Sequence, residues 1–133
     1  MTIEEIKNII EGIGPPATYY AWPEDDPLHP VPPLPYIVWY LPSTDNFAAE
    51  DTVYQKISAV NVELYTAYKD FALEEQLEDT LTGAFLFWNK SESYLDKEHM
   101  FEALYETGTI ITPDAPETPA TQTNETEDAI NGE

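Results

Sequence analysis

Residues 56–66 have the sequence KISAVNVELYT, in which apolar and polar side chains alternate from residue 60 onward. Side chains of a β-strand point alternately to the two faces of its sheet, so this period predicts a half-buried strand. The alternation divides the residues between the two faces as follows: Val60, Val62 and Leu64 on the apolar one, and Asn61, Glu63 and Tyr65 on the polar one. A half-buried strand requires neighbouring strands and a covering layer, and the flanking segments are expected to supply both.

Three more segments are predicted to be strands. PYIVWYL, residues 35–41, is a continuous apolar and aromatic run, which favours a strand covered on both faces. AFLFW (84–88) and HMFEALYETG (99–108) are expected to be two further strands, joined by a loop over residues 89–98. The polar segment 42–54 is expected to be either a hairpin or a long loop.

Two amphipathic helices are predicted. Isoleucines recur at helical spacing over residues 3–12, and Thr2 with Glu5 fits a capping box at the start. Leucines recur every four residues over 70–83, and Asp70 is a favourable N-cap. Four acidic residues of this second helix are expected on its solvated side: Glu74, Glu75, Glu78 and Asp79.

A proline-rich connection is predicted over residues 13–35, because eight of the 12 prolines lie there. Proline disrupts helix interiors and central strands, so this segment is expected to run extended over the surface. Its aromatic residues Tyr19, Tyr20 and Trp22 are predicted to anchor it to the body.

The expected fold is therefore an α+β domain over residues 1–112, with the element order α-β-β-α-β-β. Its sheet is expected to be small, antiparallel or mixed, with about four strands and two helices packed on one face. Residues 113–133 are acidic, rich in Pro and Thr, and without aromatics. Such a composition cannot bury enough apolar surface to offset ordering entropy, so this tail is predicted to be disordered unless a partner binds it.

The charge is extreme, with 26 acidic residues against 5 lysines and no arginine, for a net charge of −21. Affinity for nucleic acid depends on cations, so stable binding is not expected. Two interpretations of the acidity remain open: it keeps the protein soluble, or it lines a channel that DNA passes without binding. No apolar run is long enough to cross a membrane. The N-terminus lacks the features of a signal peptide, so synthesis in the cytoplasm is expected.

No catalytic, cofactor-binding or metal-binding constellation is apparent. Cysteine is absent, and His29 and His99 stand in unrelated contexts, so no catalytic metal site is expected. G-x-S-x-G and phosphate-binding loop patterns are missing. Carboxylates are so numerous that no acid–base pair, such as Glu98 with Glu102, stands out. A non-enzymatic structural protein without a cofactor is predicted, and an enzyme that uses a carboxylate pair remains the alternative.

The order of motifs resembles that of the tail-terminator, tail-completion and minor capsid proteins of siphophages that infect Gram-positive bacteria. The resemblance covers residues 1 to about 110 and rests on these motifs: PYIVWYL, Ala49-Glu50-Asp51, Tyr54, VELYT at 62–66, Lys69-Asp70 and SESYLDKEHMFEALYE at 91–106.

This resemblance implies a hexameric ring that docks on the last ring of the tail tube, stops its growth and joins it to the head connector. The implied partners are other copies of the chain, the major tail tube protein and the connector or stopper protein, in the virion at the head-proximal end of the tail. DNA would pass through without specific binding, and no membrane is involved. The residues expected at the subunit or tube interface are Tyr40, Phe47, Glu50, Asp51 and Tyr54. For the aromatics among them, packing within their own domain stays open.

Two other functions remain open. One is a neighbouring head–tail joining or tail-completion role within the same virion region. The other is an acidic inhibitor that mimics DNA and binds a host protein, which the net charge favours. Mimicry would require carboxylates spaced like phosphates along one face.

Overall fold

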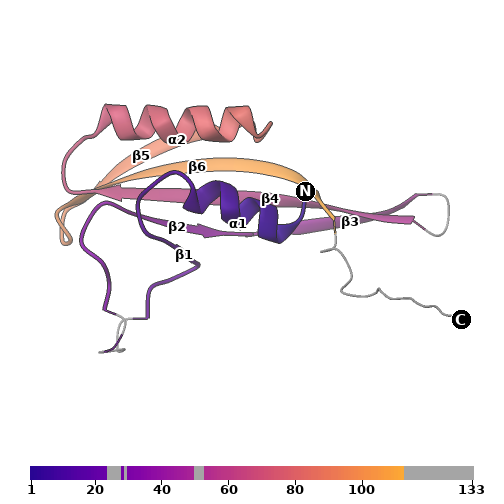
Figure 1. The fold of residues 1–133 in the computed structure, drawn as a ribbon, viewed down its shortest axis with the longest axis horizontal. Coiled ribbons are helices and arrows are strands. Elements are labelled where there is room, and N and C mark those ends of the chain that lie inside the picture. The colour runs from indigo at the N-terminus through magenta and orange to yellow at the C-terminus, as the bar shows by residue number, and fades with distance from the viewer. Residues whose placement is uncertain (24–27, 29, 50–52, 113–133) are drawn as a thin grey trace, which may run out of the picture.

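The structure, a computed structural model, describes residues 1–23, 28, 30–49 and 53–112. Within these residues the chain forms an α+β fold with two helices and six strands (Figure 1). The elements are α1 (Ile3–Glu11), β1 (Ala17–Tyr19), β2 (Tyr36–Tyr40), β3 (Thr44–Ala49), β4 (Val53–Thr66), α2 (Phe71–Gly83), β5 (Asn89–Leu95) and β6 (Met100–Ile111). The prediction of an α+β class with two helices is confirmed.

The sheet is mixed and is organised around β4, its longest strand. Five strands follow one another in the order β1-β2-β4-β6-β5, and β3 pairs with β4 beyond the end of β2. β1 and β2 are parallel, and all other pairs are antiparallel. β4 therefore has β6 along one edge and β2 followed by β3 along the other.

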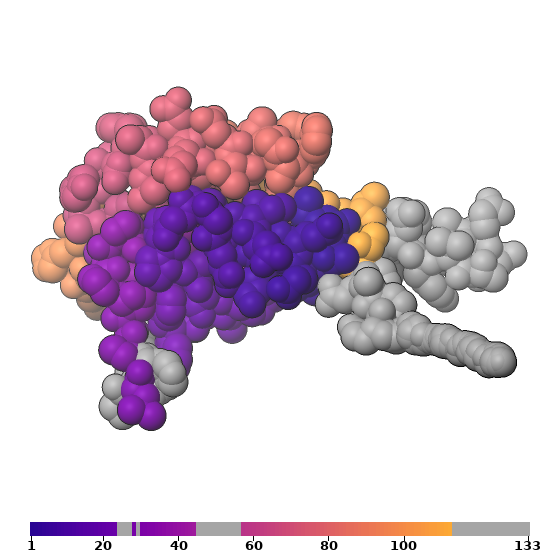
Figure 2. All heavy atoms as spheres, in the orientation of Figure 1, coloured from indigo at the N-terminus to yellow at the C-terminus, as the bar shows by residue number. Residues whose placement is uncertain are grey.

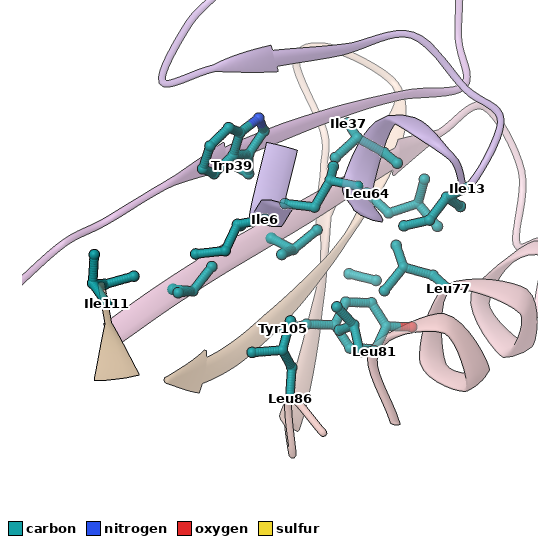
Figure 3. Packing of buried hydrophobic residues seen from close by; sticks show 14 residues of the cluster. Ile6, Ile13, Ile37, Trp39, Leu64, Leu77, Leu81, Leu86, Tyr105 and Ile111 are labelled. Atoms are coloured by element: carbon teal, nitrogen blue, oxygen red, sulfur yellow. The ribbon is translucent and has the colours of Figure 1, made fainter. Parts of the chain in front are cut away.

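The core lies between the sheet and both helices, which cover the same face (Figure 3). The register places Trp39, Val62 and Tyr105 side by side across β2, β4 and β6. Against this face pack buried apolar side chains of both helices: Ile6 and Ile10 from α1, and Leu77 and Leu81 from α2. The predicted alternation is thus confirmed, because Val60, Val62 and Leu64 of β4 all belong to this core.

The two helices form one continuous layer over the core (Figure 2). The side-chain amide of Gln76 in α2 donates to the carbonyl oxygen of Ile13, just after α1, at 2.6 Å. Both predicted N-caps are present. Thr2 and Glu5 form a reciprocal capping box at α1, and Asp70 accepts from the backbone of Leu73 at the start of α2.

The predicted count of four strands and the predicted element order are wrong. One additional strand, β1, lies in the proline-rich connection, and a second, β3, lies in the segment 42–54. β3 pairs antiparallel with β4, from Thr44 opposite Ser58 to Ala49 opposite Val53, which matches the hairpin alternative.

The predicted strand over 84–88 is also wrong, because the chain there wraps around the end of α2. The backbone nitrogen of Leu86 donates to the Leu81 carbonyl oxygen at 2.9 Å, and Phe85 has a φ of 63°. Leu86 is the one fully buried residue of this apolar run; Ala84 and Trp88 are partly buried against the core, while Phe85 and Phe87 are exposed. The strand is instead β5, in the segment expected to be a loop. β5 is an edge strand whose exposed side chains leave no apolar period to detect.

The expectation that all four acidic residues of the second helix face solvent is wrong for Glu74. Its side chain is buried and accepts hydrogen bonds from Lys69 at 2.6 Å and Lys90 at 2.9 Å. Lys90 also donates to Glu78 at 2.7 Å, and Lys69 also pairs with Glu92. The lysines come from outside the helix, so the helical period alone cannot place this carboxylate.

Candidate functional site

The sheet face turned away from the helices, called the polar face below, carries a row of tyrosines and carboxylates. Neither of the two described helices covers it. The pairing of β2, β4 and β6 sets three rows across this face: Tyr36, Tyr65 and Glu102; Val38, Glu63 and Leu104; Tyr40, Asn61 and Glu106. Polar side chains that are far apart in the sequence therefore meet at neighbouring positions.

Glu63 lies at the centre of a hydrogen-bond network on the polar face. The hydroxyl of Tyr40 donates to its Oε2 at 2.9 Å, and the hydroxyl of Tyr65 donates to its Oε1 at 2.6 Å. The Tyr65 hydroxyl also lies 3.4 Å from Oε2 of Glu102. Two phenols hold the Glu63 carboxylate in place, and two carboxylates share one phenol.

The electrostatics of the network follow from burial and from uncompensated negative charge. Burial raises the pKa of Tyr65, and the adjacent Glu63 and Glu102 raise it further, so this phenol stays a neutral donor. Burial and then the charge of Glu63 raise the pKa of Glu102, against a hydrogen bond from Tyr65 that lowers it. None of the ion pairs found in the described part of the chain involves Glu63 or Glu102.

The start of the proline-rich connection packs its aromatic residues against β2. Tyr19 contacts Trp39 with ring centroids 4.8 Å apart, Tyr20 contacts Tyr40 at 5.7 Å, and Trp22 contacts Tyr36 at 5.8 Å, all edge to face. Such pairs contribute about 0.5–1.5 kcal/mol each beyond their buried area. Residues that anchor the connection would be expected to make contacts of this kind. The anchoring role itself stays a prediction.

A tight turn at Tyr20 directs the connection onto the polar face. Tyr20 has a φ of 74°, and the backbone nitrogen of Ala21 donates to the carbonyl oxygen of Tyr19 at 2.9 Å. A three-residue turn with positive φ at its centre is rare and strained for a residue with a Cβ. The hydrogen bond from the Tyr20 nitrogen to the Trp39 carbonyl oxygen, 2.8 Å long, holds the turn on β2.

A cavity of about 450 Å³ lies between the connection and the polar face. Its aromatic lining comes from Tyr20, Trp22, Tyr36 and Tyr65, and its acidic lining from Glu63 and Glu98. Glu98 stands in the turn between β5 and β6. Cavities of this size are typical of sites for a side chain or a small ligand.

Of the residues predicted at a subunit interface, Tyr40, Phe47 and Tyr54 lie in the described part of the chain, and none of these three lines the cavity. Tyr40 belongs to the hydrogen-bond network of the polar face. Phe47 lies on β3 and Tyr54 on β4, in the part of the pair beyond β2. Glu50 and Asp51 lie outside the described residues. Their proposed contacts with other copies or with a tube stay predictions.

Sequence reasoning missed Glu63, Tyr65 and Glu98 as parts of one site. The polar half of the 61–65 alternation was the available signal for the first two, since it shows which residues share a face. Nothing in the sequence indicates that Glu98 and Trp22, which are far apart along the chain, line the same cavity.

In the described part of the chain, no group of three or more His, Asp or Glu is arranged to hold a metal ion. Neither described helix has the length and apolar character needed to cross a membrane. No protein-family model matches the chain, and no curated protein has a matching sequence.

Proposed function

We propose that this protein is a non-enzymatic structural component of a long-tailed bacteriophage. More particularly, we propose that it is the tail terminator, which forms a ring at the head-proximal end of the tail tube. The ring would stop tube growth and present a surface to the head connector.

The observation that carries the proposal is that the segments responsible for the resemblance are neighbours in the sheet. The motif at 35–41 contains β2, and the motif at 62–66 ends β4; they pair from Tyr36 opposite Tyr65 to Val38 opposite Glu63. The motif at 91–106 supplies most of β5 and β6, which continue the sheet beyond β4. Together these motifs supply residues of four adjacent strands of the sheet, β2, β4, β6 and β5.

A second feature that supports assembly is the extension of β3 and β4 beyond the body, called the arm below (Figure 1). β6 pairs with β4 only from Lys56 onward, and β2 only from Asn61 onward. At about 3.3 Å per residue, Val53 lies about 23 Å along the strand from Val60, where the core begins. Such an arm can reach a neighbouring subunit or the tube, and two of the expected interface residues lie on it.

The charge is compatible with a ring around DNA. A lumen lined by carboxylates repels the phosphate backbone, so DNA would pass without binding. The absence of arginine removes the side chain that recognises phosphate in a bidentate manner.

The proposal is tested by assembling the tail tube protein encoded in the same genome in the presence of this protein. Electron microscopy and mass measurement should show shortened tubes with six copies at one end. A copy number that increases with tube length would refute a terminator. Absence from purified virions, together with recovery on a basic DNA-binding host protein, would favour the DNA-mimic alternative.

The arm offers a variant for the same assay. The double substitution Phe47→Ala with Tyr54→Ala should abolish capping while unfolding stays cooperative. Ser91→Ala on the opposite edge strand β5 is the matched control and should cap normally. Equal capping by both variants would remove the arm from the interface.

A further inference from the structure

The cavity between the proline-rich connection and the polar face combines aromatic walls with carboxylates. Trp22 and Tyr36 are in edge-to-face contact at one wall, and Tyr36 in turn packs on Tyr65, with ring centroids 5.4 Å apart. Aromatic faces attract cations through their quadrupole, most strongly where water is excluded. These walls therefore favour a positively charged occupant.

In the described part of the chain, no ion pair involves the carboxylates at the cavity. Among the described residues that line it, Glu63 and Glu98 are acidic and none is Lys or His. Glu63 already accepts from Tyr40 and Tyr65, but a carboxylate has about four acceptor positions, so capacity remains. The negative potential also acts on the phenols, since burial and then the charge of Glu98 raise the pKa of Tyr36.

From this combination we propose that the cavity binds an arginine side chain presented by a basic segment of a partner protein. The guanidinium plane stacks on the aromatic wall, and its N–H groups donate to Glu63 and Glu98. The aliphatic stem packs against Val38 and Met100, which also line the cavity.

The choice of arginine on another protein follows from chemistry and from composition. A planar guanidinium stacks on aromatic rings and is more weakly hydrated than an ammonium, so it suits a partly enclosed aromatic site better than lysine. The chain contains no arginine, so a second copy cannot supply this occupant. The net charge of −21 steers a basic partner toward the protein.

This site does not depend on the proposed tail function. A protein that binds no tube could still use the cavity, and a terminator could assemble without it. The assembly assay above and the binding assay below can therefore fail separately.

The test uses the full chain and N-acetyl-arginine amide as the probe, followed by two-dimensional NMR. The neutral isostere N-acetyl-citrulline amide controls for shape, and N-acetyl-lysine amide controls for charge. Saturable shifts are expected for the Trp22 indole N–H and for backbone amides near Tyr36 and Glu63. The citrulline probe should bind at least tenfold more weakly, and the lysine probe several-fold more weakly.

Two variants locate the site without depending on a single substitution. Glu98 lies in an exposed turn, and Glu63 belongs to the hydrogen-bond network of the polar face. Glu98→Gln and Glu63→Gln should each weaken binding of the arginine amide at least threefold, and the double variant should weaken it at least tenfold. Glu75→Gln on the exposed side of α2 removes the same unit of charge at a distance and should leave the affinity unchanged.

Three outcomes would overturn the proposal. One is the absence of saturable shifts at the cavity, and another is equal loss of affinity in Glu75→Gln and Glu98→Gln, which would indicate nonspecific attraction. Binding of the lysine probe as tight as that of the arginine probe would overturn the choice of arginine.

Discussion

Replacing Glu74 by Gln tests how the ion pairs beneath α2 hold this helix on the sheet. The Glu74 side chain is 3% exposed and accepts from two lysines, Lys69 at 2.6 Å and Lys90 at 2.9 Å. Glutamine preserves the size of the side chain but removes the charge and presents an amide to an ammonium. The substitution therefore leaves Lys69 and Lys90 in place but removes the carboxylate that they share.

The size of the effect follows from burial and from the remaining partners. Removing one partner of a buried ion pair costs about 3–5 kcal/mol. Lys69 and Lys90 are 20% and 29% exposed, and each keeps a second carboxylate, Glu92 and Glu78 respectively. The cost should therefore fall below that range, close to the value of about 1.5–3 kcal/mol for a hydrogen bond to a charged group, and we expect the free energy of unfolding to fall by about 2–3 kcal/mol.

Urea denaturation at pH 7 measures this loss, with Glu75→Gln as the matched control. Glu75 is the next residue of the same helix and is exposed, so the same change in charge there should alter stability by less than about 0.5 kcal/mol. A loss of 2–3 kcal/mol corresponds to a fall in Tm on the order of 10–20 °C for a domain of this size. Equal stability of the two variants would refute the structural role of the cluster.

The pH dependence of the same comparison gives an independent check. Burial would raise the pKa of Glu74, but hydrogen bonds and charges from Lys69 and Lys90 outweigh it and hold the pKa below the ordinary 4.5. A carboxyl whose pKa is lowered by folding stabilises the fold above its unfolded pKa, and this contribution is lost as pH falls through the folded value. The difference between wild type and Glu74→Gln should therefore be constant above about pH 5.5 and should shrink below pH 4.5. A difference that grows on acidification would contradict this account.

Three further substitutions test the core, the polar face and one close backbone contact, each by urea denaturation. Ile6→Ala should lower stability by about 2–5 kcal/mol, because Ile6 is fully buried. Ile3→Ala, at a position that is 44% exposed, should lower it by less than about 1 kcal/mol. Similar losses in the two variants would argue against the packing of α1 on the sheet. Folding raises the pKa of Glu102, so its contribution to stability is present at low pH and lost as pH rises through the folded value. Glu102→Gln should therefore be at least as stable as wild type at pH 7, and a clear loss there would show that its charge is needed. Gly108→Ala should lower stability by about 1–3 kcal/mol, because the new Cβ would lie 3.1 Å from a backbone oxygen of β4. Gly83→Ala has open space around it and should raise stability by up to about 1 kcal/mol. The opposite order of the two stabilities would contradict the placement of β6 beside β4.

Local patterns predicted the elements whose signals depend on neighbours in the chain. The alternation over 60–65, the leucine period of α2 and the capping residues Thr2 and Asp70 all act within a few residues, and each is confirmed. The covering of one sheet face by two helices followed from the same periods. The resemblance to tail terminators adds a function to this fold, and that function stays a proposal.

Local patterns failed where burial depends on distant partners. The run at 84–88 is apolar enough for a strand, but Leu86 is its one fully buried residue, and the strand at this edge of the sheet is the polar β5 instead. Glu74 is buried for a related reason: the lysines that neutralise it come from outside its helix. The hydrophobicity of a segment predicts neither result, since it contains no information on which distant residues will become its neighbours.

The sequence by itself determined the α+β class, both helices, the half-buried strand β4 and the negative charge of the surface, because these depend on composition and on short-range periodicity. Only the tertiary structure decided the strand order, the edge position of β5 and the cavity on the polar face. The cavity needs Trp22, Tyr36, Glu63 and Glu98 in one place, and they come from four segments joined by strand pairing. Pairing register is a long-range property, so a site that depends on it becomes visible only in the folded chain.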